Sequence, residues 1–489
     1  MSIARRKLKL LMLALGDVII LYFSLYVALL LRNLKADDPR TWDQHFIPFT
    51  IVFALWLVVF FIAGLYELRI IKNEGRALER IAWAIGVNAL LGILIFYFLP
   101  SFRITPKTTL FLTTIITSSL LFLWRIVFNA AISRLNESRV LFFGVTKETV
   151  EMAGFLKKNP QFGYEPAALM LAPLEPSHTY QNYYTGNKFS TSTQIQDDEA
   201  LAELAKEEHA GNLPYPFFSS DEDLERVIKT HAIDTIVVSK NIKENKTLVR
   251  MFFDIIPYGV TIIDFPEFYE NITGKIPVSL IGEVWFLEHL VEGQKTLFES
   301  AKQVTDLFLA ILLALPTIAI LPFLAVAIRL DSKGPIFYRQ QRVSRRKKII
   351  EIIKLRTMVA DAEKDGVRWA DENDMRVTRV GRFLRKTRLD ELPQLWSVLK
   401  GDLSLVGPRP ERPEFVEILR TEIPFYDMRL LVKPGLTGWA QVNFPYGASV
   451  EDSMEKLQYD LFYIKNRSVI LDISTMLKTL LIIISRGGR

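Results

Sequence analysis

The chain contains no cysteine, and its five histidines, the last of which is His289, all precede residue 290. Residues 290–489 therefore contain neither residue type. Cysteine nucleophiles, histidine-based triads and zinc sites are excluded from this part of the chain. Any chemistry there must use carboxylates, lysine, arginine, tyrosine or a metal bound by oxygen ligands. The absence of cysteine is also typical of a protein in a reducing compartment.

The sequence also has little net charge, with 60 Lys and Arg residues against 54 Asp and Glu residues. Half of the residues are apolar and the mean hydropathy is +0.19, which is unusual for a soluble protein. No helix-turn-helix or aromatic stacking motif is present, so nucleic acid is not an expected partner. A modestly basic chain with long apolar runs is instead expected to meet a lipid bilayer and phosphorylated substrates.

Four apolar runs of transmembrane length precede residue 135. They cover residues 8–31, 47–66, 81–99 and 108–132. The first run follows a basic N-terminus, lacks a small-residue cleavage site and exceeds a signal-peptide core, so it is predicted to be an anchor. Lys and Arg are more frequent before the first run and in the second loop, which predicts a cytoplasmic N-terminus.

Residues 136–270 show short apolar strands that alternate with helical stretches, a pattern that predicts a parallel sheet of Rossmann-like type. The predicted strands cover residues 138–145, 164–171, 234–239 and 260–265. A long polar insertion, residues 173–216, is expected to hold one helix at about 197–208. The first strand ends in the single glycine Gly144 rather than in G-x-G-x-x-G. A structural or regulatory role is therefore favoured, and nucleotide binding stays open as the alternative.

A fifth apolar run, residues 304–330, contains Pro316 and Pro322, and many basic residues follow it. If this run crossed the bilayer, the basic residues and everything after them would lie outside the cell, against the positive-inside preference. A helix broken at Pro316 that enters and leaves on the cytoplasmic side avoids this conflict. Such a re-entrant helix is expected to pack on neighbouring helices or on a dimer partner. A plain or kinked fifth span stays open.

The acidic pair Asp390 and Glu391 lies in the sequence TRLDELPQLWSVL. The proline at position 393 indicates a helix that starts just before it, with Asp390 as its N-cap. The buried face of this helix is expected to comprise Leu392, Leu395, Trp396 and Leu399. An N-cap Asp and a first-turn Glu stabilise many ordinary helices, so the pair alone does not require a catalytic role.

The surroundings of this pair are strongly basic. The cations that precede or follow it are Lys354, Arg356, Arg376, Arg379, Arg382, Arg385, Lys386, Arg388 and Arg409. A helix N-terminus beside guanidinium groups is an anion site, which indicates phosphate chemistry. An ionised aspartate there can attack phosphorus. Magnesium, which prefers oxygen ligands, would offset the charge of a diphosphate.

The C-terminal part resembles the bacterial sugar-transferase domain of polyprenyl-phosphate hexose-1-phosphate transferases, the monotopic phosphoglycosyl transferases. The resemblance rests on the segment with Pro316 and on four motifs. These are DSKGPIFYRQQR (331–342), KLRTM (354–358), TRVGRFLRKTRLDELPQLWSVLKGDLSLVGPRP (378–410) and KPGLTGWAQVN (433–443). The front half, including residues 258–287, is similar to the large subgroup that initiates exopolysaccharide, O-antigen or capsule assembly.

This resemblance implies a two-step transfer. Asp390 would attack the sugar-linked phosphorus of a UDP-sugar, expel UMP and form a phosphosugar-aspartate, which undecaprenyl phosphate or another polyprenyl phosphate would then attack. Glu391 would be its dyad partner, and both carboxylates are candidate Mg²⁺ ligands. Candidate phosphate contacts are Lys354, Arg356, Arg376, Arg385 and Arg409.

Some positions depart from the family pattern. The sequence RVSRRKKII (342–350) lacks the glycines that usually follow the QxR motif, and Leu355 stands where phenylalanine is common. Arg388 replaces a usual serine and adds a cation before the dyad. In KPGLTGWAQVN, the glycines at 435 and 438 either expose backbone amides to the diphosphate or uridine or form a tight turn, and both interpretations stay open.

The expected fold class is a membrane protein of mixed α and α/β structure. Its parts are a four-helix transmembrane bundle (1–135), a Rossmann-like domain (136–270), a linker (271–300) and a mainly helical catalytic domain (301–489) with a re-entrant helix at about 304–330. Residues 459–486 are expected to form amphipathic helices on the membrane surface. The resemblance implies a multi-pass protein of the bacterial inner membrane with its catalytic domain on the cytoplasmic face. A homodimer is plausible for a membrane-embedded broken helix.

The sequence leaves two alternative functions. A membrane-anchored nucleotide-sugar dehydratase or epimerase needs G-x-G-x-x-G and a helical Tyr-x-x-x-Lys, but the only match to the second motif, Tyr184 to Lys188, has a loop composition. A non-catalytic scaffold for polysaccharide assembly would not need the intact Asp390–Glu391 pair.

Overall fold

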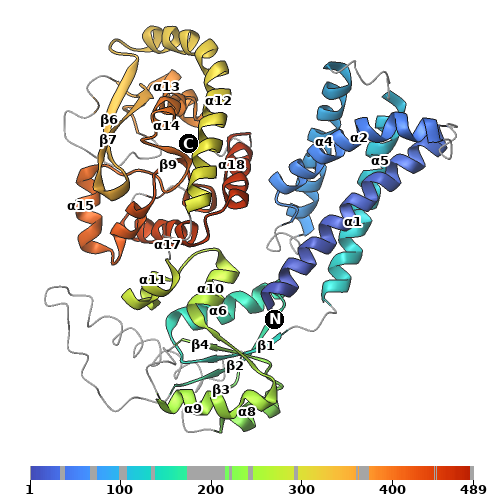
Figure 1. Cartoon of the computed structure of the whole chain (residues 1–489), viewed down its shortest axis with the longest axis vertical. Coiled ribbons are helices and arrows are strands. Elements are labelled where there is room, and N and C mark those ends of the chain that lie inside the picture. Colours follow the sequence, from blue (N-terminus) through green and yellow to red (C-terminus); the bar gives the residue numbers. More distant parts are fainter. Residues whose placement is uncertain are drawn as a thin grey trace. The chain divides into compact units, whose positions relative to one another are not determined.

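The computed structural model contains two compact units, Met1–Phe268 and Tyr269–Arg489 (Figure 1). The structure describes residues 2–32, 39–66, 74–98, 107–133, 138–172, 215–219, 223–239, 246–290, 296–359, 362, 374–444, 447 and 449–484.

Four long helices form the N-terminal part of the first unit, as the sequence predicts. They are α1 (Ser2–Leu31), α2 (Pro39–Ile62), α4 (Glu74–Phe98) and α5 (Lys107–Ser133). Each contains an apolar window long enough to cross a membrane. An ion pair lies between α1 and α5, where Arg125 Nη2 donates to Asp17 Oδ2 at 2.6 Å. Charges are costly at membrane depth unless they are paired, so this contact fixes the register of the two helices.

The rest of the first unit is an α/β domain with a five-stranded parallel sheet of order β3-β2-β1-β4-β5. Its elements are β1 (Ser138–Phe143), α6 (Lys147–Lys158), β2 (Tyr164–Met170), β3 (Phe217–Phe218), α8 (Leu224–His231), β4 (Thr235–Val238), α9 (Lys246–Asp254), β5 (Thr261–Asp264) and α10 (Phe265–Thr273), which runs into the second unit. The four predicted strands are confirmed as β1, β2, β4 and β5. The two-residue strand β3 was not predicted, and the helix expected at 197–208 lies outside the described residues.

The carboxyl ends of β1 and β4 mark the place where the strand order reverses, which is the usual ligand position in such sheets. Gly144 has a φ of 86° there, and Thr146 and Thr149 form a capping box at the start of α6. Ser239 Oγ donates to the carbonyl oxygen of Gly144 at 2.7 Å. These polar groups are thus bonded to one another, and the structural or regulatory role of this domain stays a prediction.

The second unit is mainly helical and has two small sheets. Beyond α10 its elements are η5 (Val278–Leu280), α11 (Glu283–His289), α12 (Thr296–Asp331), β6 (Phe337–Val343), η7 (Arg345–Lys347), β7 (Ile349–Leu355), α13 (Arg379–Thr387), η8 (Leu389–Gln394), α14 (Leu395–Leu399), β8 (Ser404–Val406), α15 (Pro413–Glu422), η9 (Tyr426–Leu431), β9 (Gly435–Thr437), α16 (Trp439–Asn443), α17 (Val450–Asn466) and α18 (Val469–Ile484). Strands β6 and β7 form an antiparallel hairpin, and β8 pairs in parallel with β9. The core includes Leu395, Val398, Val406, Leu457 and Leu461.

Much of the segment that the sequence assigns to a linker (271–300) belongs to this core. Ile276 and Val278 are buried in the same apolar cluster as Leu457 and Leu461. The backbone N–H of Ile276 donates to the carbonyl oxygen of Gln458 at 3.1 Å. The short apolar stretches of this segment do not by themselves predict that its side chains are buried.

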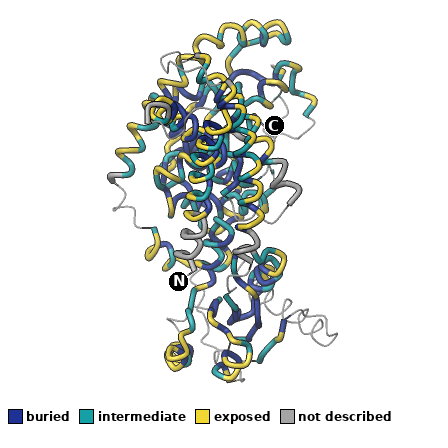
Figure 2. The backbone as a smooth tube through the Cα atoms, turned by 90° about the vertical axis from the view of Figure 1, so that its right-hand side faces the viewer, coloured by how far each residue is buried: buried dark blue, intermediate teal, exposed yellow. Residues whose placement is uncertain are grey.

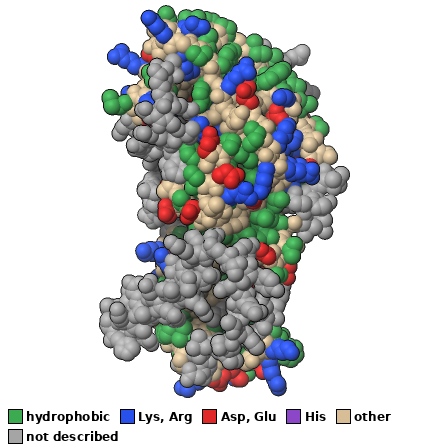
Figure 3. Space-filling model, turned by 90° about the vertical axis from the view of Figure 1, so that its left-hand side faces the viewer, with side chains coloured by type: hydrophobic (Ala, Val, Ile, Leu, Met, Phe, Trp, Pro, Cys, Tyr) green, Lys and Arg blue, Asp and Glu red, His purple; other side chains and the backbone are tan. Residues whose placement is uncertain are grey.

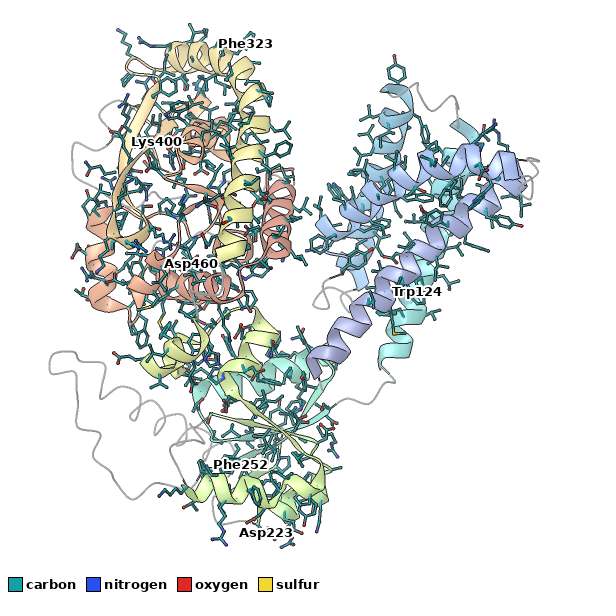
Figure 4. The ribbon with its side chains drawn as sticks, viewed as in Figure 1. Trp124, Asp223, Phe252, Phe323, Lys400 and Asp460 are labelled. Atoms are coloured by element: carbon teal, nitrogen blue, oxygen red, sulfur yellow. The ribbon has the colours of Figure 1, made fainter. Side chains whose placement is uncertain are left out.

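Helix α12 is continuous through Pro316 and Pro322, so the predicted break does not occur in its secondary structure. Thr317 Oγ1 donates to the carbonyl oxygen of Leu313 at 2.7 Å, and such bonds help a helix to accommodate a proline. The helix instead changes direction within its length, and Phe323, one residue after Pro322, lies near the turn (Figures 1 and 4). The prolines therefore coincide with a bend rather than with an end of the helix.

Both ends of α12 are fastened to the second unit. Near its start, Lys302 Nζ donates to Asp472 Oδ2 at 2.6 Å, and Ser404 Oγ donates to Asp306 Oδ2 at 2.7 Å. At its end, Asp331 Oδ2 accepts a bond of 2.8 Å from the N–H of Val380. The middle of α12 is largely exposed and apolar (Figure 2). Hydrophobic side chains also lie beside Lys and Arg side chains at the upper end of Figure 3.

Candidate active site

The Asp390–Glu391 pair lies on η8, a short 3-10 helix that follows α13 directly. Arg388 forms the junction in a left-handed conformation with a φ of 58°, and it caps both helices. The prediction that Asp390 is an N-cap was therefore wrong, because Arg388 occupies that position. The N–H of Glu391 donates to the carbonyl oxygen of Arg388 at 3.2 Å. The side chain of Asp390 is thus not needed to cap the helix.

The pair faces the interior of the unit. Asp390 and Glu391 are each 8% exposed, and Gln394 and Leu395 are also buried. Trp396, which the sequence places on the buried face, is 65% exposed. The sequence assumed one α-helix, whereas the tighter turn of η8 and the five-residue helix α14 point the tryptophan outward.

Three cations surround Glu391. Arg409 Nη2 donates to Oε1 of Glu391 at 2.8 Å, and Lys354 Nζ lies 3.3 Å from the same oxygen. Arg388 Nη1 lies 3.7 Å from Oε2. Burial opposes ionisation of Glu391, but Arg409, Lys354 and Arg388 together hold its pKa well below the ordinary value. Glu391 is therefore a permanently ionised acceptor.

Asp390 has a different environment. Its Oδ1 atom is buried and has no hydrogen-bond partner among the described residues. Burial and the charge of Glu391 raise the pKa of Asp390 to about 6, against the opposing charges of Lys354, Arg388 and Arg385. The pKa values of these two adjacent carboxyl groups thus differ, as is common where such groups have different chemical tasks. The Oδ1 atom of Asp390 is therefore unpaired, and the carboxyl group of Asp390 is ionised above about pH 6.

The β6–β7 hairpin supplies the cations on one side of the site. Lys354 on β7 is paired with Tyr338 on β6, and burial lowers the pKa of Lys354 while Glu391 opposes this effect. Arg342 lies on the same face of β6, where alternate residues are partly buried. Its Nη1 donates to the carbonyl oxygen of Pro410 at 2.9 Å. Arg342 was not predicted, although the alternation in FYRQQRV would have placed it on this face.

Two predicted phosphate contacts are engaged elsewhere. The guanidinium of Arg356 donates to the carbonyl oxygens of Lys333 at 2.8 Å and Ser332 at 2.7 Å, and it holds the turn after α12. Arg376 Nη2 donates to Asp374 Oδ2 at 2.6 Å. These bonds go to residues other than Asp390 and Glu391.

Arg385 lies close enough to Asp390 for its charge to lower the aspartate pKa. Its Nε donates to Thr357 Oγ1 at 2.9 Å. Of the five predicted cations, the structure therefore brings Lys354, Arg385 and Arg409 to the pair.

The two glycines of KPGLTGWAQVN, Gly435 and Gly438, act through close packing. A Cβ on Gly435 would lie 2.1 Å from the backbone nitrogen of Gly407, and one on Gly438 would lie 2.2 Å from its carbonyl oxygen. The N–H of Gly435 donates to the carbonyl oxygen of Pro408, and the N–H of Gly407 donates to that of Thr437, each at 2.9 Å. These two amides are bonded within the protein, and the contact holds the loop that carries Arg409.

A magnesium ion fits the pair only as part of a metal–substrate complex. Among the described residues, no group of three or more acidic or histidine side chains could hold a metal ion. Mg²⁺ is commonly held by one or two carboxylates together with water and substrate phosphates. The unpaired Oδ1 of Asp390 and the adjacent Glu391 meet this requirement. When bound, the ion would offset charge on a diphosphate.

Comparison with known proteins gives matches to one family. The family described as "Bacterial sugar transferase" matches residues 297–486. The chain is 39% identical over 236 residues to a UDP-N-acetylgalactosamine-undecaprenyl-phosphate N-acetylgalactosaminephosphotransferase of Aeromonas hydrophila; the match covers 47% of this chain and 53% of the relative, about half its length.

Two further relatives are named UDP-glucose:undecaprenyl-phosphate glucose-1-phosphate transferases. The protein of Klebsiella pneumoniae is 29% identical over 355 residues, which cover 70% of this chain and 67% of the relative. The protein of Caulobacter vibrioides is 41% identical over 180 residues, which cover 36% of this chain and 67% of the relative.

Proposed function

This chain belongs to the bacterial sugar transferase family, and we propose that it transfers a hexose 1-phosphate from a UDP-sugar to undecaprenyl phosphate. The product would be an undecaprenyl diphosphate sugar, which starts the assembly of an exopolysaccharide, O-antigen or capsule. The relatives act on undecaprenyl phosphate according to their names. The observation that carries the proposal is the buried, unpaired Oδ1 of Asp390 beside a Glu391 that three cations keep ionised.

In the first step, the carboxylate of Asp390 attacks the phosphorus that bears the sugar. The bond from this phosphorus to the oxygen of UMP breaks, and UMP leaves with the electron pair. The result is an acyl phosphate between Asp390 and the sugar phosphate. Because the nucleophile is already ionised above its pKa of about 6, no base has to remove a proton.

In the second step, a phosphate oxygen of undecaprenyl phosphate attacks the same phosphorus. The bond between phosphorus and Asp390 breaks, which restores the carboxylate and gives the diphosphate product. Arg409 and Lys354 keep Glu391 ionised, and both are placed to neutralise phosphate charge. We assign Mg²⁺ to Asp390 and Glu391 together with the donor diphosphate.

The contacts of α12 support a re-entrant position in the membrane. Residues 307–328 carry no charge, and they are flanked by the anchoring residues Asp306 and Asp331. Both anchors bond to elements of one unit, namely β8 and α13. A helix that crossed the bilayer would place its ends on opposite sides of a core about 30 Å thick. We infer that α12 enters and leaves on one side and that its bend replaces the expected break.

We assign the protein to the bacterial inner membrane as a multi-pass protein with its catalytic domain on the cytoplasmic face. The relatives are bacterial, and the helices α1, α2, α4 and α5 are long and apolar enough to span. The basic residues around the first span favour a cytoplasmic N-terminus. UDP-sugars are cytoplasmic, so the donor would reach Asp390 from that side.

The test is capture of the intermediate. Full-length protein in detergent is incubated with a panel of UDP-sugars but without the lipid acceptor. We expect one donor to release a single equivalent of UMP and to add the mass of the hexose phosphate to the peptide that contains Asp390. Asp390→Asn should give neither signal while it retains the same thermal unfolding profile. UMP release without an adduct at Asp390 would refute the covalent route.

A further inference from the structure

A second, buried arginine bonds to the backbone of the loop that carries Arg409. Arg429 on η9 is 7% exposed, and its Nη2 donates to the carbonyl oxygen of Arg409 at 2.9 Å. Arg409 in turn donates from its own Nη2 to Glu391 at 2.8 Å. Arg429 is therefore linked to the dyad through Arg409 and does not bond to the dyad directly.

Asp460 on α17 fixes the position of Arg429. Its Oδ2 accepts a bond of 2.9 Å from Arg429 Nη2, the same nitrogen that bonds to the loop. Tyr426 adds a third contact, because its hydroxyl oxygen lies 2.6 Å from Arg429 Nη1. Asp460 is 1% exposed and Tyr426 is 2% exposed (Asp460 is labelled in Figure 4). The guanidinium thus has one fixed orientation.

A buried ion pair such as Arg429–Asp460 is by itself weak evidence for a stabilising role. Burial raises the pKa of Asp460 to about 6, although Arg429 opposes the shift. Desolvation of a buried ion pair often cancels its Coulomb attraction, so apolar side chains of similar volume would stabilise the core equally well. What apolar side chains cannot supply is a directed donor to the backbone of Arg409.

A second, partly buried contact holds the neighbouring residue of the same loop. Arg342 Nη1 donates to the carbonyl oxygen of Pro410 at 2.9 Å. The two guanidinium groups therefore hold consecutive carbonyl groups from different elements, β6 and η9. The segment between Pro408 and Glu411 is fixed in its backbone while the Arg409 side chain faces Glu391.

We propose that Arg429, oriented by Asp460 and Tyr426, is the positioning residue for Arg409 in the transfer reaction. This inference rests on the proposed function. It predicts that loss of the Arg429–Asp460 contact slows the formation of the phosphosugar intermediate only because Arg409 is misplaced. A shift of about 1 Å in such a contact can reduce a rate by up to about 100-fold.

The experiment is a double-mutant cycle on the full-length protein. The rate of UMP release and the apparent KM for the UDP-sugar are measured for the unmodified chain, Asp460→Asn, Arg409→Ala and the double variant. Glu455→Gln is the matched control, since Glu455 lies on the same helix and pairs with Lys275, away from the loop. We expect Asp460→Asn to be about 10- to 100-fold slower and Glu455→Gln to equal the unmodified chain.

The decisive result is the effect of Asp460→Asn when Arg409 is already absent. If Asp460 acts through Arg409, the double variant should be no slower than Arg409→Ala alone. The proposal would be overturned if Asp460→Asn reduced the rate of UMP release by the same factor with and without Arg409. It would also be overturned if Asp460→Asn and Glu455→Gln reduced this rate equally. If Asp460→Asn does not fold, Tyr426→Phe is compared in the same two backgrounds and decides the question by the same criterion. An unmodified chain that releases no UMP would refute the proposed function instead.

Discussion

Lys354 and Glu391 lie 37 positions apart in the sequence, yet the Nζ of the lysine is 3.3 Å from Oε1 of the glutamate. The contact joins the edge of the β6–β7 hairpin to the 3-10 helix that carries Asp390. It explains how two adjacent carboxyl groups can coexist in a buried site. One is neutralised by cations, and the other keeps a free oxygen atom for chemistry.

The first prediction concerns pH. The pKa of Asp390 is raised to about 6, so the carboxylate needed for attack is lost as the pH falls through this value. The rate at which the intermediate forms should therefore be half-maximal near pH 6 and close to its maximum by pH 7.5. The check is the initial rate of UMP release between pH 4.5 and 8.

The charge of Glu391 is one cause of this raised pKa. In Glu391→Gln, the residual activity should therefore have its acidic limb at a lower pH. A limb near pH 4 in the unmodified chain would contradict the assignment of Asp390.

A second prediction separates two neighbouring cations that the sequence treats alike. Lys354→Ala should leave a buried glutamate with one cation fewer and slow UMP release by about 100-fold. Arg356→Ala should instead reduce the free energy of unfolding by about 2 kcal/mol, because its bonds go to the backbone of Ser332 and Lys333. Thermal unfolding and the rate per folded molecule are measured for both variants. A stable but inactive Arg356→Ala protein would restore Arg356 as a phosphate contact.

The third prediction uses the left-handed conformation of Arg388. Arg388→Gly and Arg388→Ala both remove the cation 3.7 Å from Glu391, but only glycine adopts a φ of 58° without strain. The two variants should therefore lose activity equally, by less than about tenfold because the side chain is partly exposed. The glycine variant should be more stable than the alanine variant by about 1 kcal/mol. Equal stabilities would show that the backbone at this junction is not strained.

The fourth prediction concerns the membrane position of α12, and it uses the absence of cysteine from the chain. Single cysteines at Ser300 and Lys333, which flank the apolar part of α12, are labelled with a membrane-impermeant maleimide. Both should react in inside-out vesicles and neither in intact spheroplasts. Asp37→Cys, between the first two apolar runs, should show the opposite pattern. Labelling of Ser300→Cys and Lys333→Cys from different sides would mean that α12 crosses the bilayer.

The features that the sequence predicted correctly are local or repetitive. The four long apolar helices follow from the length of their apolar runs, and the strands around Val140 and Ile236 follow from short apolar segments between polar ones. The features that it missed depend on contacts between distant residues. Nothing local indicates that Arg356 bonds to the turn after α12 or that Trp396 points outward.

The glycines illustrate the same limit. Gly435 was expected to serve a turn or to expose a free amide, but its role is set by Gly407, 28 positions earlier, whose backbone it approaches too closely for any side chain. The motif KPGLTGWAQVN correctly indicated that position 435 needs a glycine. Only the pairing of β8 with β9 gives the physical reason.

The attachment of α12 at both ends affects how the protein responds to the thickness of the bilayer. A helix that returns to the side it entered from does not have to match the thickness of the bilayer, whereas the spanning helices do. If α12 is re-entrant as proposed, thicker or thinner membranes should strain α1, α2, α4 and α5 but leave the depth of Asp390 unchanged. In the proposed reaction, the carboxylate of Asp390 would then stay level with the phosphate of undecaprenyl phosphate in membranes of different composition.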